Sequence, residues 1–349
     1  MSFIPCVAGS SGMQISIEIN RKKLYTDFRK NLVQEITMQN LIIAFNAVLP
    51  VMLCIMLGYF LARIGMIKEE LRKGLNSLCF KVFLPFYLFN SVYDTDVSAA
   101  FNPGLMIFCC LCMIAWFAAL MVIIPRMEKG NPRRGVLIQA MFRSNFALFG
   151  LPMAETLCGK ENMGPTNLLI GVCVPLVNVL AVITLETFRG GKPSVKKMLL
   201  GIAKNPLFIA SLLGLAFNLL NIPLYTDLKK TVTDLGKVAT PLSMVALGAS
   251  FSFTSAKTYR KQLLLGVSGK LIVSPLIMVT LGALLGFRAE TLVPILIYFG
   301  APTAVSSFPM AQQMDGDGEL AASLVVFTSA LSILTIFLWV FALKTLGLI

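Results

Sequence analysis

Polar and helix-breaking residues gather in an otherwise apolar stretch at positions 142 to 155, which reads FRSNFALFGLPMAE. The stretch contains Arg143, Asn145, Gly150 and Pro152, where a helix in contact with lipid would carry leucine or isoleucine. Proline removes a backbone donor and clashes with the carbonyl group one turn earlier, and glycine lowers the cost of unwinding. We therefore predict a broken helix whose free amide and carbonyl groups are available to a ligand.

A second stretch of the same kind begins at Tyr298 and reads YFGAPTAVSSFPMAQQMDGDGE, with Pro302, Ser306, Ser307 and Pro309. The amino end of a half-helix carries roughly half a positive charge together with unpaired amide donors, so two such ends favour an anion between them. The alternative is a pair of proline kinks used for packing. The matched positions in the two halves of the chain favour a carboxylate-binding site.

Ionisable residues inside apolar segments are costly and usually face a cavity or a partner. Arg143 either holds an anionic ligand or extends toward the basic loop at 126–134. Glu155 either carries a proton during coupling or lies at the outer mouth. Lys81, Lys237 and Lys270 are further candidates for coupling or charge pairing, with snorkelling toward a helix end as the alternative use of a lysine.

The residue types that are missing exclude much enzyme chemistry. The chain has 349 residues and no histidine, which removes imidazole-based acid–base catalysis, triads that need an imidazole and most catalytic zinc sites. Its carboxylates do not cluster. We therefore predict a protein that is not an enzyme and has no cofactor and no metal site. Because most of the excess positive charge lies in short loops between apolar runs, we also predict that it does not bind nucleic acid.

The elements that must position these residues are apolar segments about 20 residues long. The chain is 56% hydrophobic and 13% charged, and its apolar runs match the length that crosses a ~30 Å hydrocarbon layer. The runs are continuously apolar, so they predict helices and not barrel strands. We expect an all-α integral membrane protein with ten transmembrane helices: 40–62, 74–93, 103–125, 135–158, 165–187, 203–221, 232–252, 262–286, 289–313 and 319–347.

Basic residues are distributed unevenly between the loops. Sixteen lie in the odd-numbered loops and four in the even-numbered ones, which predicts cytoplasmic odd loops and both chain ends outside. The basic tail at 1–38 contradicts this rule. We predict that the tail is an extension created by an early start codon and that Met38 is the natural start.

The two halves of the chain repeat each other. Four pairs of residues are separated by 156 positions, namely Pro50 and Pro206, Gly58 and Gly214, Lys81 and Lys237, Pro85 and Pro241. Because each repeat holds five spans, the second copy enters the membrane inverted, as in many secondary transporters. We predict a first repeat at 39–187, a short cytoplasmic linker at 188–204 and a second, inverted repeat at 205–349.

The chain resembles a bacterial member of the auxin efflux carrier family over about residues 38 to 349. The similar segments are NAVLPVMLCIMLGYFLARIGMI, LNSLCFKVFLPFYLF, FRSNFALFGLP, TPLSMVALGASFSF and APTAVSSFPMAQQMDGDGELA. The resemblance implies that spans four and nine are broken and cross at mid-membrane, with Asn145, Gly150 and Pro152 at the crossing in span four. Ser306 and Ser307 lie where plant members place their crossover proline, and Pro309 follows two residues later.

The resemblance also implies an elevator mechanism, in which spans one, two, six and seven form a dimer-forming scaffold and the other spans move. We therefore expect a homodimeric secondary transporter of small organic anions, mono- or dicarboxylates similar to malate or auxin, in the lipid bilayer of the plasma membrane. The alternative is a membrane sensor that binds a carboxylate ligand without net transport.

Overall fold

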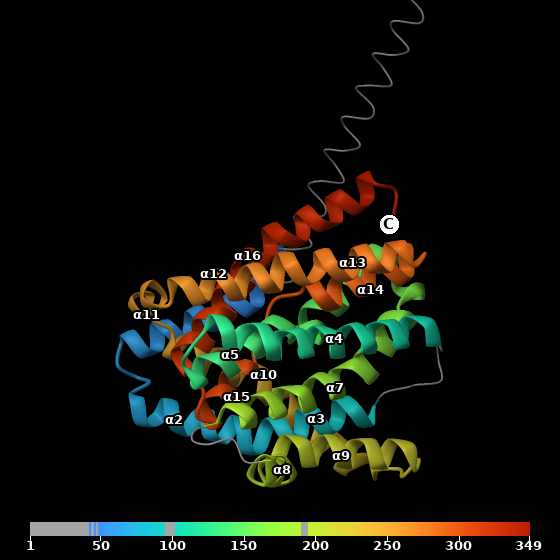
Figure 1. Cartoon of the computed structure of the whole chain (residues 1–349). Helices are drawn as coiled ribbons and strands as arrows, with labels where there is room; N and C mark the ends of the chain where they lie inside the picture. Colours follow the sequence, from blue (N-terminus) through green and yellow to red (C-terminus); the bar gives the residue numbers. More distant parts are fainter. Residues whose placement is uncertain (1–41, 43–44, 47, 95–101, 190–194) are drawn as a thin grey trace, which may run out of the picture.

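The computed structural model describes residues 42, 45–46, 48–94, 102–189 and 195–349. The predicted tail at 1–38 lies outside these ranges. The described residues form helices and contain no strand, so the expected all-α class is confirmed. In Figure 1 the helices α3, α4, α7 and α9 run side by side and make up much of one layered bundle.

Five helical stretches are long and apolar enough to cross a membrane. They are Glu69–Tyr93, Pro103–Met127 (α4), Gly164–Phe188 (α7), Arg260–Leu284 and Gly318–Thr345 (α16). The first consists of α2 (Glu69–Leu78), a π-helical turn (Cys79–Phe83) and α3 (Leu84–Tyr93). The fourth likewise consists of α12 (Arg260–Ser268), a π-helical turn (Gly269–Val273) and α13 (Ser274–Leu284).

The other predicted spans correspond to shorter, interrupted or more polar helices. Among these are an apolar helix at Val48–Arg63, α9 (Pro206–Leu219) and α10 (Thr226–Ser250), with the separate helices α8 (Val195–Lys204) and α11 (Phe253–Thr258) in the loops. Every predicted span coincides with a helix or an interrupted pair of helices in the described residues. That all ten cross the membrane stays a prediction.

Spans four and nine are the two interrupted ones, as predicted. The fourth consists of α5 (Asn131–Phe142), a π-helical turn (Phe146–Gly150) and α6 (Leu151–Cys158). The ninth consists of α14 (Ala289–Gly300) and α15 (Ser307–Gln313). The interruptions are therefore residues 143–145 and 301–306.

Local sequence signals explain where the helices begin. Asn102 accepts a hydrogen bond from the Leu105 amide (3.0 Å), and Asp317 accepts one from the Leu320 amide (3.0 Å), which caps α4 and α16. Pro103 and Pro206 are the first residues of α4 and α9, where a missing amide hydrogen costs nothing. These signals fix the helix starts independently of packing.

Large apolar side chains cover much of the outer surface. Leu264 and Leu284 are 73% and 77% exposed, although they belong to one of the long apolar stretches. Water would disfavour such a surface, whereas lipid tails are an apolar solvent for it. The structure thus fits a multi-pass membrane protein.

Two glycines let pairs of helices approach until their backbones touch. A Cβ atom added to Gly58 would lie 2.1 Å from the carbonyl oxygen of Val245, and one added to Gly214 would lie 2.7 Å from the carbonyl oxygen of Phe89. Gly58 and Gly214 are 156 positions apart, and so are Phe89 and Val245. The same contact therefore occurs twice: a glycine of the first half meets a residue of the second half, and the equivalent glycine of the second half meets the equivalent residue of the first.

We predict that Gly58→Ala destabilises the protein by about 1–3 kcal/mol, because the new methyl group meets backbone atoms that cannot move aside. Gly74→Ala is the matched control, since a Cβ atom on this helical glycine has no neighbour within 4 Å. Thermal unfolding of the purified protein in detergent measures both variants. Equal melting temperatures for the two variants would contradict the close packing.

Candidate functional site

The interruptions of spans four and nine meet each other directly. The backbone amide of Asn145 donates a hydrogen bond to the carbonyl oxygen of Pro302 at 2.8 Å. The hydroxyl group of Ser144 donates to the carbonyl oxygen of Tyr298, near the end of α14. Backbone groups that the broken helices leave unpaired are thereby satisfied by the other broken helix.

A second set of hydrogen bonds, made by Thr303, holds the interruption of span nine. Its hydroxyl group donates to the carbonyl oxygen of Ala140 at 2.8 Å, and its amide donates to the hydroxyl oxygen of Thr328 at 3.2 Å. Thr303 is buried, as are both partners. The chain between Ala301 and Ser306 is therefore tied to α5 on one side and to α16 on the other.

Arg143 lies at the start of the interruption in span four and is only 4% exposed. One guanidinium nitrogen donates to Asn178 Oδ1 (2.7 Å) and Ser306 Oγ (2.9 Å), and the other donates to Met310 Sδ (2.8 Å). All three acceptors are neutral. No acidic side chain of the described chain forms an ion pair with Arg143, so its positive charge is buried without a compensating negative charge.

A cavity of about 50 Å³ lies at the meeting point of the interruptions. Asn145 and Asn178 both line this cavity, and the side-chain Nδ2 atom of each has no hydrogen-bond partner in the described chain. Together with Arg143 they supply hydrogen-bond donors to one small space. The lining residues are Leu84, Tyr87, Leu88, Arg143, Ser144, Asn145, Phe146, Val174, Val177, Asn178, Thr240, Ser243, Tyr298, Ala304, Val305 and Ser306.

A larger cavity of about 670 Å³, which we call the vestibule, adjoins the small one because Tyr87 and Thr240 line both. Its walls come from the first helix, α3, α6 and α10. The lining residues are Asn46, Pro50, Val51, Cys54, Tyr87, Asn90, Pro152, Thr156, Thr233, Gly236, Lys237, Thr240, Pro241 and Met244. Most of these side chains are apolar or uncharged.

Three residues that the sequence suggested for the site lie beside the interruptions and not within them, and their part in binding stays a prediction. Gly150 and Pro152 follow the break and belong to helical turns, and Pro309 is the third residue of α15. A π-helical turn precedes Pro152, and the first turn of α15 holds Pro309, so neither proline has to unwind a helix. Pro302 does lie in an interruption, and Ser306 and Ser307 mark its end.

Gly150 lies in a close helix contact, whereas Ser307 has a buried hydroxyl group. A Cβ atom on Gly150 would lie 2.6 Å from Ile297 Cγ2, so this glycine permits close packing against α14. Ser307 is buried, and its hydroxyl oxygen has no hydrogen-bond partner in the described chain.

Three of the predicted charge partners lie away from the meeting point. Glu155 pairs with Lys160 at 3.2 Å and is partly exposed. Lys237 pairs with Asp234 at 3.0 Å and lines the vestibule. Lys81 is exposed and borders an apolar groove between α3, α9 and α10.

Lys270 does reach the interruption. It lies in the π-helical turn of the eighth span, is fully buried, and donates to the hydroxyl oxygen of Ser144. As with Arg143, the described chain offers it no carboxylate partner at ion-pair distance. Two buried basic side chains, Arg143 and Lys270, therefore contact the broken segment of span four or belong to it.

Sequence reasoning did not identify Asn178, Ser144 or Met310 as members of the site. Asn178 had a readable signal, because an amide in the apolar run LVNVLAV of the fifth span is unusual. Ser144 lies between Arg143 and Asn145, which the sequence did indicate. Met310 had no signal, since nothing in the sequence indicates that a thioether accepts a hydrogen bond from an arginine.

Comparison with known proteins gives one family and two archaeal relatives. The family model described as membrane transport protein matches residues 43–340. An uncharacterized transporter of Methanocaldococcus jannaschii is 26% identical over 309 residues, which are 85% of this chain and 98% of that protein. An uncharacterized transporter of Methanothermobacter thermautotrophicus is 26% identical over 300 residues, 84% of this chain and 96% of that protein.

The hydrogen bond between Thr303 and Thr328 permits a direct test of how the interruption is held. We predict that Thr328→Val destabilises the protein by about 1–3 kcal/mol, because the buried amide of Thr303 loses its acceptor while the side-chain volume is kept. Thr345→Val, in an exposed turn of the same helix, should change stability little. Thermal unfolding measures the stability of both variants. An equal loss of stability in the two would contradict the role of Thr328 as the acceptor for the Thr303 amide.

Proposed function

The chain belongs to the membrane transport protein family, to which the auxin efflux carriers belong, and from this premise we propose that it is a secondary transporter of small organic anions. The observation that carries the proposal is the buried, uncompensated charge of Arg143. A buried guanidinium that contacts only neutral acceptors is costly until an anion arrives. The unpartnered amide nitrogens of Asn145 and Asn178 add donors for the same anion.

The sizes of the two cavities bear on the substrate. A cavity needs roughly 10–15 Å³ of accessible space to hold one water molecule, so about 50 Å³ accommodates a few waters or a carboxylate group with a short stem. The rest of the substrate then lies in the vestibule. Among the vestibule residues the one cation is Lys237, which already pairs with Asp234. These features favour a monocarboxylate with an apolar body over a dicarboxylate.

Alternating access in an inverted-repeat fold is the transport mechanism that we propose. The repeated contacts of Gly58 with Val245 and of Gly214 with Phe89 support a two-fold relation between the halves. So does the hydrogen bond from Asn145 to Pro302, because these residues are 157 positions apart and contact each other. Two halves related in this way give two similar conformations, open to opposite sides.

The orientation follows from the basic loops. With the odd-numbered loops in the cytoplasm, the vestibule opens to the outside in this conformation. The scaffold consists of the first helix, α2, α3, α9 and α10, and it forms a homodimer in the plasma membrane. The remaining helices carry the site across the bilayer as an elevator.

Lys270 positions the broken segment of span four in this scheme. Its amino group donates a hydrogen bond to the Ser144 hydroxyl oxygen, and Ser144 in turn donates one to the carbonyl oxygen of Tyr298. The lysine thus holds Ser144 in position behind the carboxylate site.

We predict that Arg143→Lys weakens binding of the preferred carboxylate by tenfold or more, because an ammonium group cannot reproduce two-pronged guanidinium contacts. The ligand is first selected by a thermal-shift screen of acetate, longer fatty and aromatic monocarboxylates, malonate and malate. Arg63→Lys, at an exposed helix end where the guanidinium contacts Tyr59, is the control and should bind like wild type.

Binding and proteoliposome uptake are measured on the same variants. Wild-type affinity in Arg143→Lys would move the anion site away from the interruptions. Binding that depends on Arg143 without any uptake would favour the sensor function over transport.

A further inference from the structure

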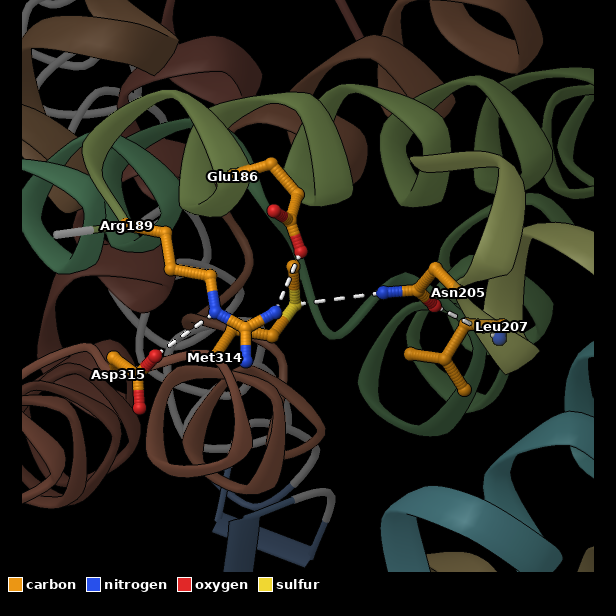
Figure 2. A network of polar contacts seen from close by, with 6 residues as sticks. All are labelled: Glu186, Arg189, Asn205, Leu207, Met314 and Asp315. Atoms are coloured by element: carbon orange, nitrogen blue, oxygen red, sulfur yellow. Dashed lines mark hydrogen bonds and ion pairs between the residues drawn. The ribbon is translucent and has the colours of Figure 1, made fainter. Parts of the chain in front are cut away.

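A second polar cluster joins the end of α7 to the turn between α15 and α16. Arg189, directly after α7, forms ion pairs with Glu186 Oε1 and with Asp315 Oδ2, each at 2.9 Å. Figure 2 shows the guanidinium group of Arg189 between these two carboxylates. Asp315 has a φ of 58°, so the backbone turns sharply where the ion pair holds it. The turn is thus fixed to the end of α7 by charge.

Met314 extends from this turn toward the start of α9. Its sulfur accepts a hydrogen bond from Asn205 Nδ2 at 3.6 Å, as drawn in Figure 2. Met314 and Asn205 are 2% and 5% exposed, so water is excluded from the contact. The other side-chain atom of Asn205, Oδ1, accepts from the Leu207 amide at 2.9 Å and caps α9. Asn205 therefore caps α9 and at the same time holds Met314 at the end of α15.

Helix α8 leads into the same contact. A Cβ atom on Gly201 would lie 2.4 Å from Glu186 Oε2, so α8 rests directly on the carboxylate that pairs with Arg189. Ile202, the next residue, is buried. Helix α8 is consequently in direct contact with the cluster.

This contact and the vestibule lie at opposite ends of α9. Asn205 immediately precedes α9, whereas Ile222 follows it and accepts a hydrogen bond from the Tyr93 hydroxyl group at 3.3 Å. Asn90, a vestibule residue, lies one helical turn before Tyr93. The protein is therefore open near one end of α9 and closed by buried side chains at the other.

We propose that Asn205 and Met314 form a releasable latch that keeps the cytoplasmic side closed while the vestibule is open, an inference that rests on the proposed alternating access. The ion pairs of Arg189 lie within the moving helices and hold Met314 in position. The latch itself joins a moving helix to the scaffold helix α9.

The chemistry of the two contacts suits these separate roles. Ion pairs with charge-assisted hydrogen bonds are strong and keep the turn intact during movement. A thioether is a weak acceptor, so the bond from Asn205 breaks at little cost when the turn moves away. The cap on α9 uses the other atom of Asn205 and persists after release.

Two conservative variants separate the latch from the cap. Asn205→Asp keeps an oxygen that caps α9 and removes the donor to Met314. Met314→Leu removes the acceptor at nearly constant volume and adds no charge. Asn102→Asp is the matched control, because Asn102 caps α4 in the same way, through the Leu105 amide.

Two thiols report the two sides of the protein through their rates of reaction with N-ethylmaleimide, followed by mass spectrometry of each peptide. Native Cys54 lines the vestibule. A cysteine introduced by Ser307→Cys lies at the buried start of α15, a helix that contacts α2 and α10. The thiol at position 307 reacts when α15 separates from these scaffold helices.

We expect both latch variants to label the thiol at position 307 roughly threefold faster than wild type or Asn102→Asp, since a lost hydrogen bond shifts the equilibrium by about that factor. Cys54 should react no faster. Unchanged labelling at position 307 overturns the latch, and faster labelling of both thiols overturns it too, because it reveals general loosening. The readout needs no substrate, so a failure of carboxylate binding at Arg143 is a distinct result.

Discussion

The structure depends on one backbone hydrogen bond, from the Asn145 amide to the Pro302 carbonyl group. An unpaired peptide group in an apolar medium costs several kcal/mol, roughly 2–7 depending on the reference state, so a helix rarely breaks in a membrane. Here two helices break at the same place, and each supplies a hydrogen-bond partner to a backbone group that the other leaves unpaired. Neither interruption is stable without its counterpart, and together they create a polar space inside an apolar protein.

The polar space is unbalanced in charge, and we propose that this imbalance serves ligand binding. Arg143 and Lys270 are both buried, and no carboxylate of the described chain pairs with either one. If the site served packing alone, apolar side chains of similar volume would cost less. We propose instead that the unpaired donors serve an anion. In that proposal, binding of the anion offsets the free energy of burying the positive charge.

Much of the fold was predictable from the sequence because hydrophobic length is a strong signal in membrane proteins. The two interrupted spans were also predictable, since Arg143, Asn145 and Pro302 have few other reasons to occur in apolar segments. The exact positions of the breaks were not. Proline disrupts a helix according to its place in the turn, and the sequence does not reveal that a π-helical turn precedes Pro152 or that Pro309 lies in a first turn.

The distribution of tight and loose contacts divides the helices into two groups. Gly58 and Gly214 bring backbones into contact between the first helix and α10 and between α9 and α3, so these four helices form a rigid unit. Its contacts with the rest of the protein include a weak bond to Met314 at one end and the wide vestibule at the other. In the elevator mechanism that we propose, the other helices slide along this unit through these weak contacts. The hydrogen bonds across the interruptions join only helices of the proposed moving group, so such a movement would leave them intact.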